Sequence, residues 1–345
     1  MKRGLFNFLK KNLNKMGSAF ISGTGSYLPE KVLTNRDFEM MVDTSDEWII
    51  TRTGIRERRI CPVGKSSSDL GYEASLKAIE NSSIKSEDIE MIICATITPD
   101  MYFPSTGCMI QDKLGLENIP SFDISAACSG FIYGLEIARN FIENKKFRNV
   151  LVVAAECMSR LTDYTDRNTC VLLGDGAGAA VVSYTEKEDT GILGSYISSA
   201  GKYGKLLYVP AGGSLLPASF ETIEKRLHFM KMEGSTLFKI AIQAMTESVL
   251  TILRNFNLKK EDISLIVPHQ ANLRIISAVS KNLGIPLEKF FINIDKYGNM
   301  SAACVPIALD EAAREGRIKY GDLVVTVSFG GGLTWGANLI QWEKS

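Results

Sequence analysis

The chain carries one cysteine in a position that suits a nucleophile. Cys128 follows a predicted strand around Phe122 and precedes a helix predicted over residues 131–142. The first-turn N–H groups of a helix lack intrahelical partners and carry a partial positive charge, which favours thiolate over thiol. A cysteine among small residues is also a common core residue. The position therefore indicates a nucleophile only if the rest of the chain supplies a base or an oxyanion partner.

Only two histidines, His228 and His269, are available to an imidazole-dependent mechanism. His269 follows the apolar run at residues 263–267 and precedes a helix predicted over residues 272–281. Open α/β sheets present functional side chains at this edge. His228 has the setting of an ordinary, partly exposed residue. His269 is therefore the candidate base, with a hydrogen-bonded structural histidine as the alternative.

Three segments of the first half of the chain recur in the second half at an offset of roughly 170 residues. They are residues 25–27 and 194–196, residues 85–93 and 259–267, and residues 114–115 and 283–284. The repetition predicts two halves of like fold. It places the segment that holds Cys128 opposite residues 297–301, so chemistry can be assembled from both halves.

Strands alternate with helices in both halves. The first half is predicted to have strands at 19–23, 91–95, near 122, at 150–155 and around 181, with helices at 69–81, 106–114 and 131–142. The second is predicted to have strands from 192 and at 264–267, 291–294 and 323–328, with helices at 236–255, 273–283 and 302–315. This order implies α/β units with a largely parallel sheet. Two such halves would stack as an α/β/α/β/α layered sandwich.

The composition is that of a soluble enzyme rather than a nucleic-acid or membrane protein. The 345 residues include 39 basic and 39 acidic side chains, and 45% of the residues are hydrophobic, enough for two packed halves. The seven cysteines are scattered and form no closely spaced pair, so neither a disulfide framework nor a zinc site is indicated. We expect a cytoplasmic location, no metal, no cofactor, no nucleic-acid partner and no stable membrane insertion.

The first residues differ from the remainder because they are basic and lack acidic side chains. We expect a tail at residues 1–17, a first half at 18–185 and a second half at 186–345. A disordered tail, or translation that begins at Met16, is favoured for the first segment. A weak interfacial helix or a degenerate targeting peptide is the alternative.

Two glycine-rich runs need separate interpretations. Residues 174–179 precede a predicted strand rather than follow one, so close backbone packing is favoured over nucleotide binding. Residues 329–332 follow the last long strand. Their backbone N–H groups could approach a substrate carbonyl.

Several motifs together resemble the thiolase-fold condensing enzymes, and within them the beta-ketoacyl-ACP synthase III family. They are Ala127-Cys128-Ser129-Gly130 and the segments at residues 44–49, 51–58, 174–178, 267–272, 297–303 and 329–332. The resemblance runs from about residue 19 to residue 342. It implies a thiolase-like duplicated α/β fold and homodimers.

The resemblance implies a catalytic triad of Cys128, His269 and Asn299. Cys128 would attack the thioester of an acyl-CoA primer, with acetyl-CoA as the expected primer, and its N–H and that of Gly331 would hold the oxyanion. Malonyl-ACP would then lose carbon dioxide while His269 and Asn299 stabilise the enolate. The product would be a 3-oxoacyl-ACP, so the reaction would initiate type II fatty acid synthesis.

Other functions of the same scaffold are less well supported. Elongating relatives use a second histidine in place of Asn299, and a degradative thiolase uses a second cysteine near the C-terminus. Cys304 is the only late cysteine, and its apolar surroundings favour a core role. A non-catalytic carrier-docking protein would require an unused triad. Acyl transfer or ester formation through Cys128 in another pathway stays open.

By resemblance, Trp48, Arg52 and Arg167 would bind the adenine and phosphate end of CoA by stacking and charge-assisted hydrogen bonds. Lys239 and Arg274 would meet the acidic carrier protein. Taken alone, each of these side chains is more typical of a packed or solvated surface.

The acyl pocket would involve Phe103, Leu173 and Phe329, with Phe103 contributed by the partner of a homodimer. Two residues depart from the family pattern. Ser235 stands where relatives often have asparagine, and Leu173 replaces a phenylalanine seen in many acetyl-preferring relatives. The choice among acetyl, propionyl and branched primers is therefore open.

Overall fold

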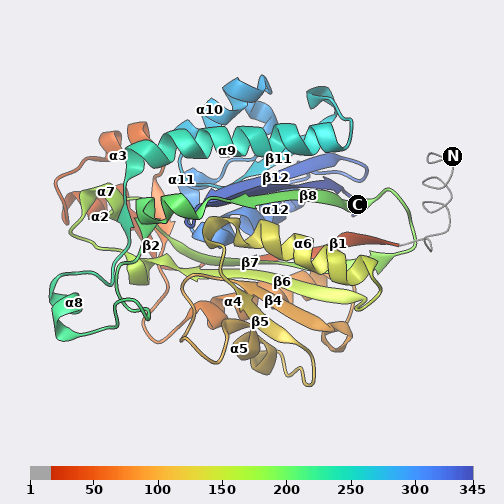
Figure 1. The fold of residues 1–345 in the computed structure, drawn as a ribbon, viewed down its shortest axis with the longest axis horizontal. Helices are drawn as coiled ribbons and strands as arrows, with labels where there is room; N and C mark the ends of the chain where they lie inside the picture. Colours follow the sequence, from red (N-terminus) through yellow and green to blue (C-terminus); the bar gives the residue numbers. More distant parts are fainter. Residues whose placement is uncertain (1–16, 345) are drawn as a thin grey trace.

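The computed structural model describes residues 17–344, which form two stacked β-sheets with helices between and outside them (Figure 1). The predicted basic tail, apart from Gly17, lies outside the described residues. The first sheet has five strands. In spatial order they are β1 (Ser18–Tyr27), β7 (Asp175–Thr185), β6 (Asn149–Cys157), β4 (Met91–Ala95) and β5 (Ser121–Ile124). Strand β4 runs parallel to β5 and β6, whereas β7 runs antiparallel to both β6 and β1.

The second sheet repeats this pattern. Its strands are β11 (Leu265–Pro268), β12 (Leu323–Gly330), β13 (Thr334–Gln341) and β8 (Gly191–Ser199). Strand β11 is parallel to β12 and to a short bridge at Phe290, and β13 is antiparallel to β12 and β8. The duplicated α/β fold is therefore confirmed. The division at residues 185 and 186 stays a prediction.

The expectation of a largely parallel sheet was wrong, because both sheets are mixed. After β6 the chain returns to β7 through two short helical segments, the 3-10 segment Met158–Leu161 and α7 (Arg167–Cys170), and β12 leads into β13 through a tight turn. Parallel neighbours need a long crossover, usually a helix, whereas antiparallel strands can be joined by a short connection.

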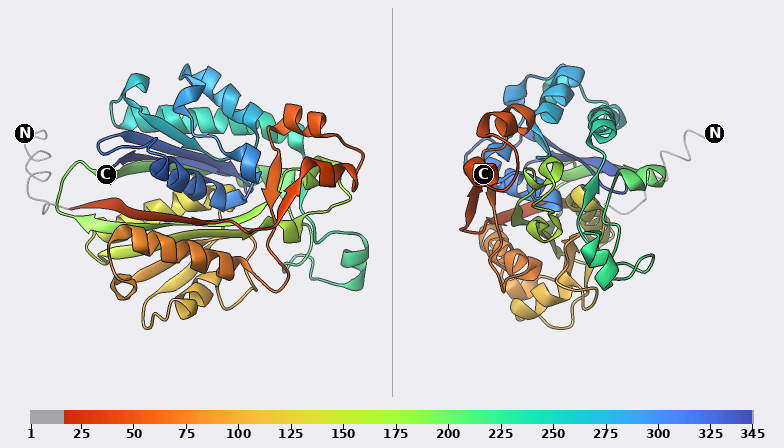
Figure 2. Two further views of the ribbon diagram at one scale, coloured as in Figure 1. Left: turned by 180° about the vertical axis from the view of Figure 1, so that it is seen from behind. Right: turned by 90° about the vertical axis from the view of Figure 1, so that its left-hand side faces the viewer.

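Helices fill three layers, as the two views of Figure 2 show. Helices α6 (Gly130–Glu143) and α12 (Cys304–Arg314) lie between the sheets in the central core. Helices α4 (Ser67–Ser82) and α5 (Thr106–Lys113) cover the outer face of the first sheet. Helices α9 (Gly234–Asn255) and α10 (Leu273–Leu283) cover the outer face of the second. The predicted α/β/α/β/α order of layers is therefore confirmed.

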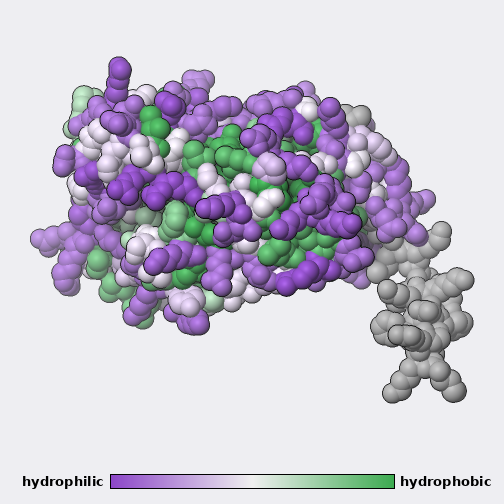
Figure 3. All heavy atoms as spheres, turned by 90° about the horizontal axis from the view of Figure 1, so that it is seen from above, coloured by the Kyte–Doolittle hydropathy of each residue, from purple (hydrophilic) through white to green (hydrophobic). Residues whose placement is uncertain are grey.

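Helix α9 is the one helix in the described part of the chain that is long and apolar enough to cross a membrane. Its buried side chains, such as Val249 and Ile252, pack against the second sheet. The face of the molecule that carries α9 and α10 is largely polar, with hydrophobic side chains visible between the polar ones (Figure 3). Packing in the outer layer therefore explains the apolar character of α9.

Shorter elements lie at one end of the sandwich. Between β1 and α4 the chain forms β2 (Val32–Thr34), α2 (Asn35–Glu39), α3 (Asp46–Thr53) and β3 (Glu57–Arg59). The second half adds β9 (Leu207–Tyr208), α8 (Phe220–Glu224), β10 (Lys231–Met232) and α11 (Ile294–Tyr297). The fully buried Arg58 joins the first insertion to the segment before β7, since its Nε donates to the Val171 carbonyl at 2.9 Å.

Candidate active site

Cys128 lies in a sharp turn between β5 and α6. The turn is the 3-10 segment Ala127–Ser129, and Ala127 has a φ of 45°, in the left-handed region. Ser328 Oγ, at the end of β12, donates to the Cys128 carbonyl at 2.7 Å. A Cβ atom on Gly330 would lie 2.5 Å from the Cys128 nitrogen, so only glycine allows β12 to approach this closely. The nucleophile is thus held by both halves of the chain.

A second turn of the same kind precedes α12. The segment Ser301–Ala303 is again a 3-10 turn, and Ser301 has a φ of 50°. The two turns contact each other between the sheets. Asn299 lies just before the second turn, so the duplication brings Asn299 toward Cys128.

His269 follows the last residue of β11 and is almost completely buried. Its backbone N–H donates to the Val327 carbonyl at 2.8 Å, which fixes it beside the end of β12. The side chain is 3% exposed, and Nδ1 is buried without a hydrogen-bond partner. Burial lowers the pKa of His269 to about 3. The imidazole is therefore neutral at neutral pH.

The Asn299 amide is oriented by contacts to its oxygen. Oδ1 accepts the Ser301 N–H at 2.9 Å and lies 3.8 Å from the Cys304 sulfur. The backbone of Asn299 is bound on both sides, donating to the Leu172 carbonyl at 2.8 Å and accepting from the Gly174 N–H at 3.0 Å. With Oδ1 occupied, the amide N–H2 is the end left for a ligand.

Cys128, His269 and Asn299 line one cavity of about 280 Å³. Phe329 and Gly330 form part of its inner wall. The predicted triad is therefore brought together in space, from β5–α6, β11–α10 and α11–α12. A buried thiol, an imidazole and an amide around one cavity can perform nucleophilic acyl transfer.

The charge state of the nucleophile differs from the thiolate expected of a helix N-terminus. Burial raises the pKa of Cys128 to about 12, although the nearby Ser301 hydroxyl acts to lower it; the Glu156 carboxylate raises it further. The thiol and the His269 imidazole are therefore both neutral at rest. The proton has to pass from sulfur to a base as the substrate is attacked.

A second cavity of about 340 Å³ extends from Cys128 and Asn299 in another direction. Leu173 and Gly331 line it, together with side chains that are mostly apolar. These are Ile97, Met158, Leu161, Leu172, Leu207, Val209, Met230 and Met232. Leu173 and Gly331 thus line a cavity that Cys128 also lines, whereas Phe329 lines the first cavity; their predicted roles stay predictions. Phe103 lines neither cavity and is 85% exposed.

Trp48 and Arg52 line the first cavity, and Arg167 reaches Trp48 from α7. The Arg167 guanidinium lies 4.2 Å from the centroid of the Trp48 ring and 4.0 Å from the Asp43 carboxylate. The predicted CoA-binding side chains are therefore adjacent. An adenine ring can stack on this face of Trp48 only after Arg167 moves.

Arg274 also lines the cavity entrance, with its guanidinium 5.4 Å from the Phe238 ring centroid. Lys239 is exposed on α9. Ser235, which departs from the family pattern, is exposed and donates to the Glu233 carboxylate at 2.8 Å. His228 packs against Phe229 and lines neither cavity.

Sequence reasoning missed Glu156 and Ser301 near Cys128. Glu156 is fully buried on β6, and its carboxylate accepts hydrogen bonds from Thr98 Oγ1 at 2.6 Å and Thr96 Oγ1 at 3.2 Å. Burial raises its pKa to about 7, against the bonds that it accepts. For Glu156, the only signal in the sequence was a single acidic residue inside an apolar strand.

Comparison with known proteins identifies the family to which the chain belongs. Models of the 3-oxoacyl-[acyl-carrier-protein] synthase III family match residues 122–201, and their C-terminal counterpart matches residues 253–342. The beta-ketoacyl-[acyl-carrier-protein] synthase III of Caldanaerobacter subterraneus is 57% identical over 327 residues, which cover 95% of this chain and 98% of that protein. The Clostridioides difficile protein of the same name is 56% identical and covers 94% and 98%. This chain belongs to the beta-ketoacyl-[acyl-carrier-protein] synthase III family.

Solved structures of the family have the same fold. The 3-oxoacyl-[acyl-carrier-protein] synthase III of Aquifex aeolicus is 47% identical, with a TM-score of 0.87 over 94% of this chain and 100% of that one. The Thermus thermophilus family member is 41% identical, with a TM-score of 0.88 and the same coverage. The chain is thus a thiolase-like, acyl-transferring condensing enzyme, which excludes a non-catalytic docking protein.

Proposed function

We propose that this chain condenses an acyl-CoA primer with malonyl-ACP and releases CoA, carbon dioxide and a 3-oxoacyl-ACP, as the initiating step of type II fatty acid synthesis. One observation carries the proposal. Cys128, His269 and Asn299 surround a single cavity that opens toward Trp48 and Arg52.

The first half-reaction forms an acyl-enzyme. The Cys128 sulfur attacks the primer thioester while neutral His269 accepts its proton, so two buried charges arise only as the bond forms. The N–H groups of Cys128 and Gly331 would hold the tetrahedral oxyanion. The carbon–sulfur bond to CoA then breaks, and the leaving thiolate takes the proton from His269.

The second half-reaction is decarboxylative. Between the half-reactions the neutral His269 ring takes the tautomer that carries its proton on the nitrogen facing the cavity. This N–H and the amide N–H of Asn299 donate to the thioester oxygen of malonyl-ACP, which stabilises the enolate as the bond to the carboxylate breaks. The enolate carbon attacks the acyl carbonyl and the Cys128 thiolate departs. One proton from solvent restores the thiol.

Residues at the entrance of the first cavity are proposed to bind the parts of the substrates that lie outside the triad. Trp48, Arg52 and Arg167 are proposed to bind the adenine and phosphates of CoA, with Arg167 moving off the Trp48 face. Lys239 and Arg274 are proposed to bind the acidic carrier protein, because both lie on the helices beside the entrance.

Acetyl-CoA is the expected primer, and the size of the second cavity makes a larger acyl-CoA a second candidate primer. Its volume is about 340 Å³, so the cavity has room for an acyl group longer than two carbons. Leu173 and three methionines, Met158, Met230 and Met232, give it an adaptable apolar wall. Short branched or medium-length primers therefore also fit.

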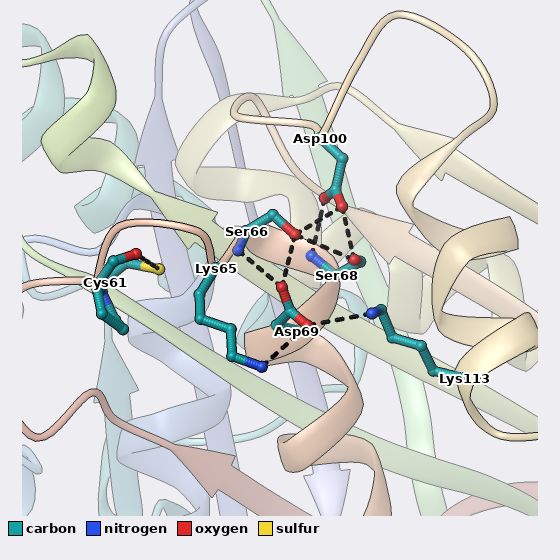
Figure 4. Close-up of polar contacts among 8 residues, drawn as sticks. Cys61, Lys65, Ser66, Ser68, Asp69, Asp100 and Lys113 are labelled. Carbon is teal, nitrogen blue, oxygen red and sulfur yellow. Dashed lines mark hydrogen bonds and ion pairs between the residues drawn. The ribbon is translucent and has the colours of Figure 1, made fainter.

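We further propose a homodimer in which Phe103 of one subunit closes the acyl cavity of the other. Tyr102 and Phe103 are 80% and 85% exposed, although their loop begins at a rigid anchor. Figure 4 shows this anchor: the Asp100 carboxylate accepts from Ser66 Oγ at 2.7 Å and from Ser68 Oγ at 2.6 Å at the start of α4. Exposed apolar side chains on an anchored loop are typical of a protein–protein interface.

A cytoplasmic location is proposed on the chemistry of the cysteines. All seven are free thiols, and Cys94, Cys170 and Cys304 are completely buried. Free thiols are typical of a reducing compartment.

Product analysis with competing primers tests the function. Purified protein would receive malonyl-ACP with acetyl-, isobutyryl- and hexanoyl-CoA, and mass spectrometry would identify the carrier-bound products. We expect a 3-oxoacyl-ACP, whose length names the primer. Acylated Cys128 without a condensed product, but with acyl transfer to added amines or alcohols, would instead assign an acyltransferase of another pathway.

A further inference from the structure

Cys304, the first residue of α12, lies directly behind the Asn299 amide. It is 0% exposed and lines neither cavity. Its sulfur accepts the Met300 N–H at 3.1 Å and lies 3.8 Å from Asn299 Oδ1 and 3.9 Å from the Gln270 carbonyl. One sulfur atom therefore touches both segments that supply the second half of the triad, because Gln270 follows His269 in sequence.

The surroundings of the sulfur favour the protonated thiol, although the Met300 N–H donates to it. Both Asn299 Oδ1 and the Gln270 carbonyl are acceptors, so a thiolate in this position would face two oxygen atoms without a donor from either. Burial also raises the pKa of Cys304 well above its ordinary value. The thiol can then donate its single proton to one of the two oxygens. Because Cys304 is sealed from both cavities, it has no access to substrate and no role as a thiolase base.

We propose that Cys304 is a positioning residue for the decarboxylation step. Its S–H and the Ser301 N–H together occupy the two acceptor sites of Asn299 Oδ1, so the amide cannot flip and its N–H2 group stays directed at the substrate. This role rests on the proposed use of Asn299 as the enolate donor. Cys304 thus acts on the second half-reaction and leaves the first unaffected.

Three variants of the full-length enzyme test the proposal. In Cys304→Ala we expect condensation to fall about tenfold, the equivalent of one lost hydrogen bond, while acylation of Cys128 stays within about twofold. Cys304→Ser keeps a donor of similar size and should recover most of the condensation rate. Cys94→Ala removes another fully buried thiol, in β4, and serves as the control for loss of core volume.

The measurements are single-turnover acylation, followed by intact-mass spectrometry, and steady-state formation of 3-oxoacyl-ACP. Wild-type condensation by Cys304→Ala would overturn the proposal. Equal losses in both half-reactions that serine does not repair, with Cys94→Ala losing as much, would also overturn it by showing a purely structural role.

The double variant Cys304→Ala/Asn299→Ala separates this proposal from the function on which it rests. If Cys304 acts through Asn299, the double variant condenses no more slowly than Asn299→Ala alone. A further loss in the double variant contradicts the positioning role. Normal condensation by Asn299→Ala alone would instead overturn the assignment of Asn299.

Discussion

At the scale of single residues, desolvation sets the charge of the nucleophile and its base. Cys128 and His269 are both buried, and a thiolate–imidazolium pair would place two charges in a medium that solvates them poorly. The helix N-terminus and Ser301 offset this cost only in part. The neutral pair is consequently the resting state, and attack waits for a thioester carbonyl and its oxyanion donors.

Replacement of Cys128 and Asn299 should separate the two half-reactions. Cys128→Ala removes the nucleophile, so no acyl-enzyme forms. Asn299→Ala keeps acylation but loses an enolate donor, which lowers condensation by about 10²–10³-fold. Intact-mass spectra after acyl-CoA loading and assays with malonyl-ACP measure both. Normal condensation by either variant would contradict the assigned roles.

Glu156 should make the stability of the fold depend on pH. Its folded-state pKa of about 7 exceeds the ordinary value of 4.5, so between these values the folded chain holds a proton that the unfolded chain releases. Folding stability therefore falls as pH rises through this window, by up to on the order of 3 kcal/mol from this group. The opposite contribution of His269, whose pKa is lowered, is common to wild type and variant and cancels in their difference.

The variant Glu156→Gln cannot titrate at this position. Its melting temperature relative to wild type should therefore increase between pH 5 and pH 7.5, whatever the offset at pH 5. Thermal unfolding at several pH values measures this difference. A constant difference across the range would show that Glu156 does not titrate in it.

At the scale of elements, two 3-10 turns at the starts of α6 and α12 create the site. Each places a non-glycine residue, Ala127 or Ser301, in the left-handed region, at a cost of about 1–2 kcal/mol per residue. The turns let β5 pass into α6 and the Asn299 segment into α12 without a long loop. The packed turns and the end of β12 stabilise each other, and Gly330 is the point of closest approach.

Gly330→Ala should disturb the nucleophile without changing any catalytic side chain. The new Cβ atom would lie 2.5 Å from the Cys128 nitrogen, so the turn or β12 has to shift, at a cost of about 1–3 kcal/mol in the free energy of unfolding. We expect lower stability in denaturant and slower acylation of Cys128. Gly204→Ala is the matched control, because its Cβ atom meets only the Gly332 carbonyl, at 3.5 Å. Equal behaviour of the two variants would contradict the close-approach argument.

At the scale of the whole molecule, the sequence predicted the duplication and the layer order, and the family resemblance implied the triad, whose catalytic roles stay a prediction. Recurring segments and small-residue motifs at strand ends carry that information locally. It could not predict that β7 runs antiparallel, because an apolar strand has the same pattern in either direction. Strand β13 was not predicted at all. The buried carboxylate of Glu156 near Cys128 and the contact of Cys304 with Asn299 were also missed, since they depend on which segments meet after folding.

Mixing of inactive subunits tests the proposed dimer. Cys128→Ala lacks the nucleophile, and Phe103→Ala should lose much of its activity if Phe103 closes a neighbouring acyl cavity. A mixed dimer would pair an intact Cys128 in one subunit with an intact Phe103 from the other. We expect condensation activity to return when the two variants are unfolded and refolded together, relative to each refolded alone. If the chain is monomeric, or if Phe103 acts within its own subunit, refolding the mixture gives only the sum of the separate activities.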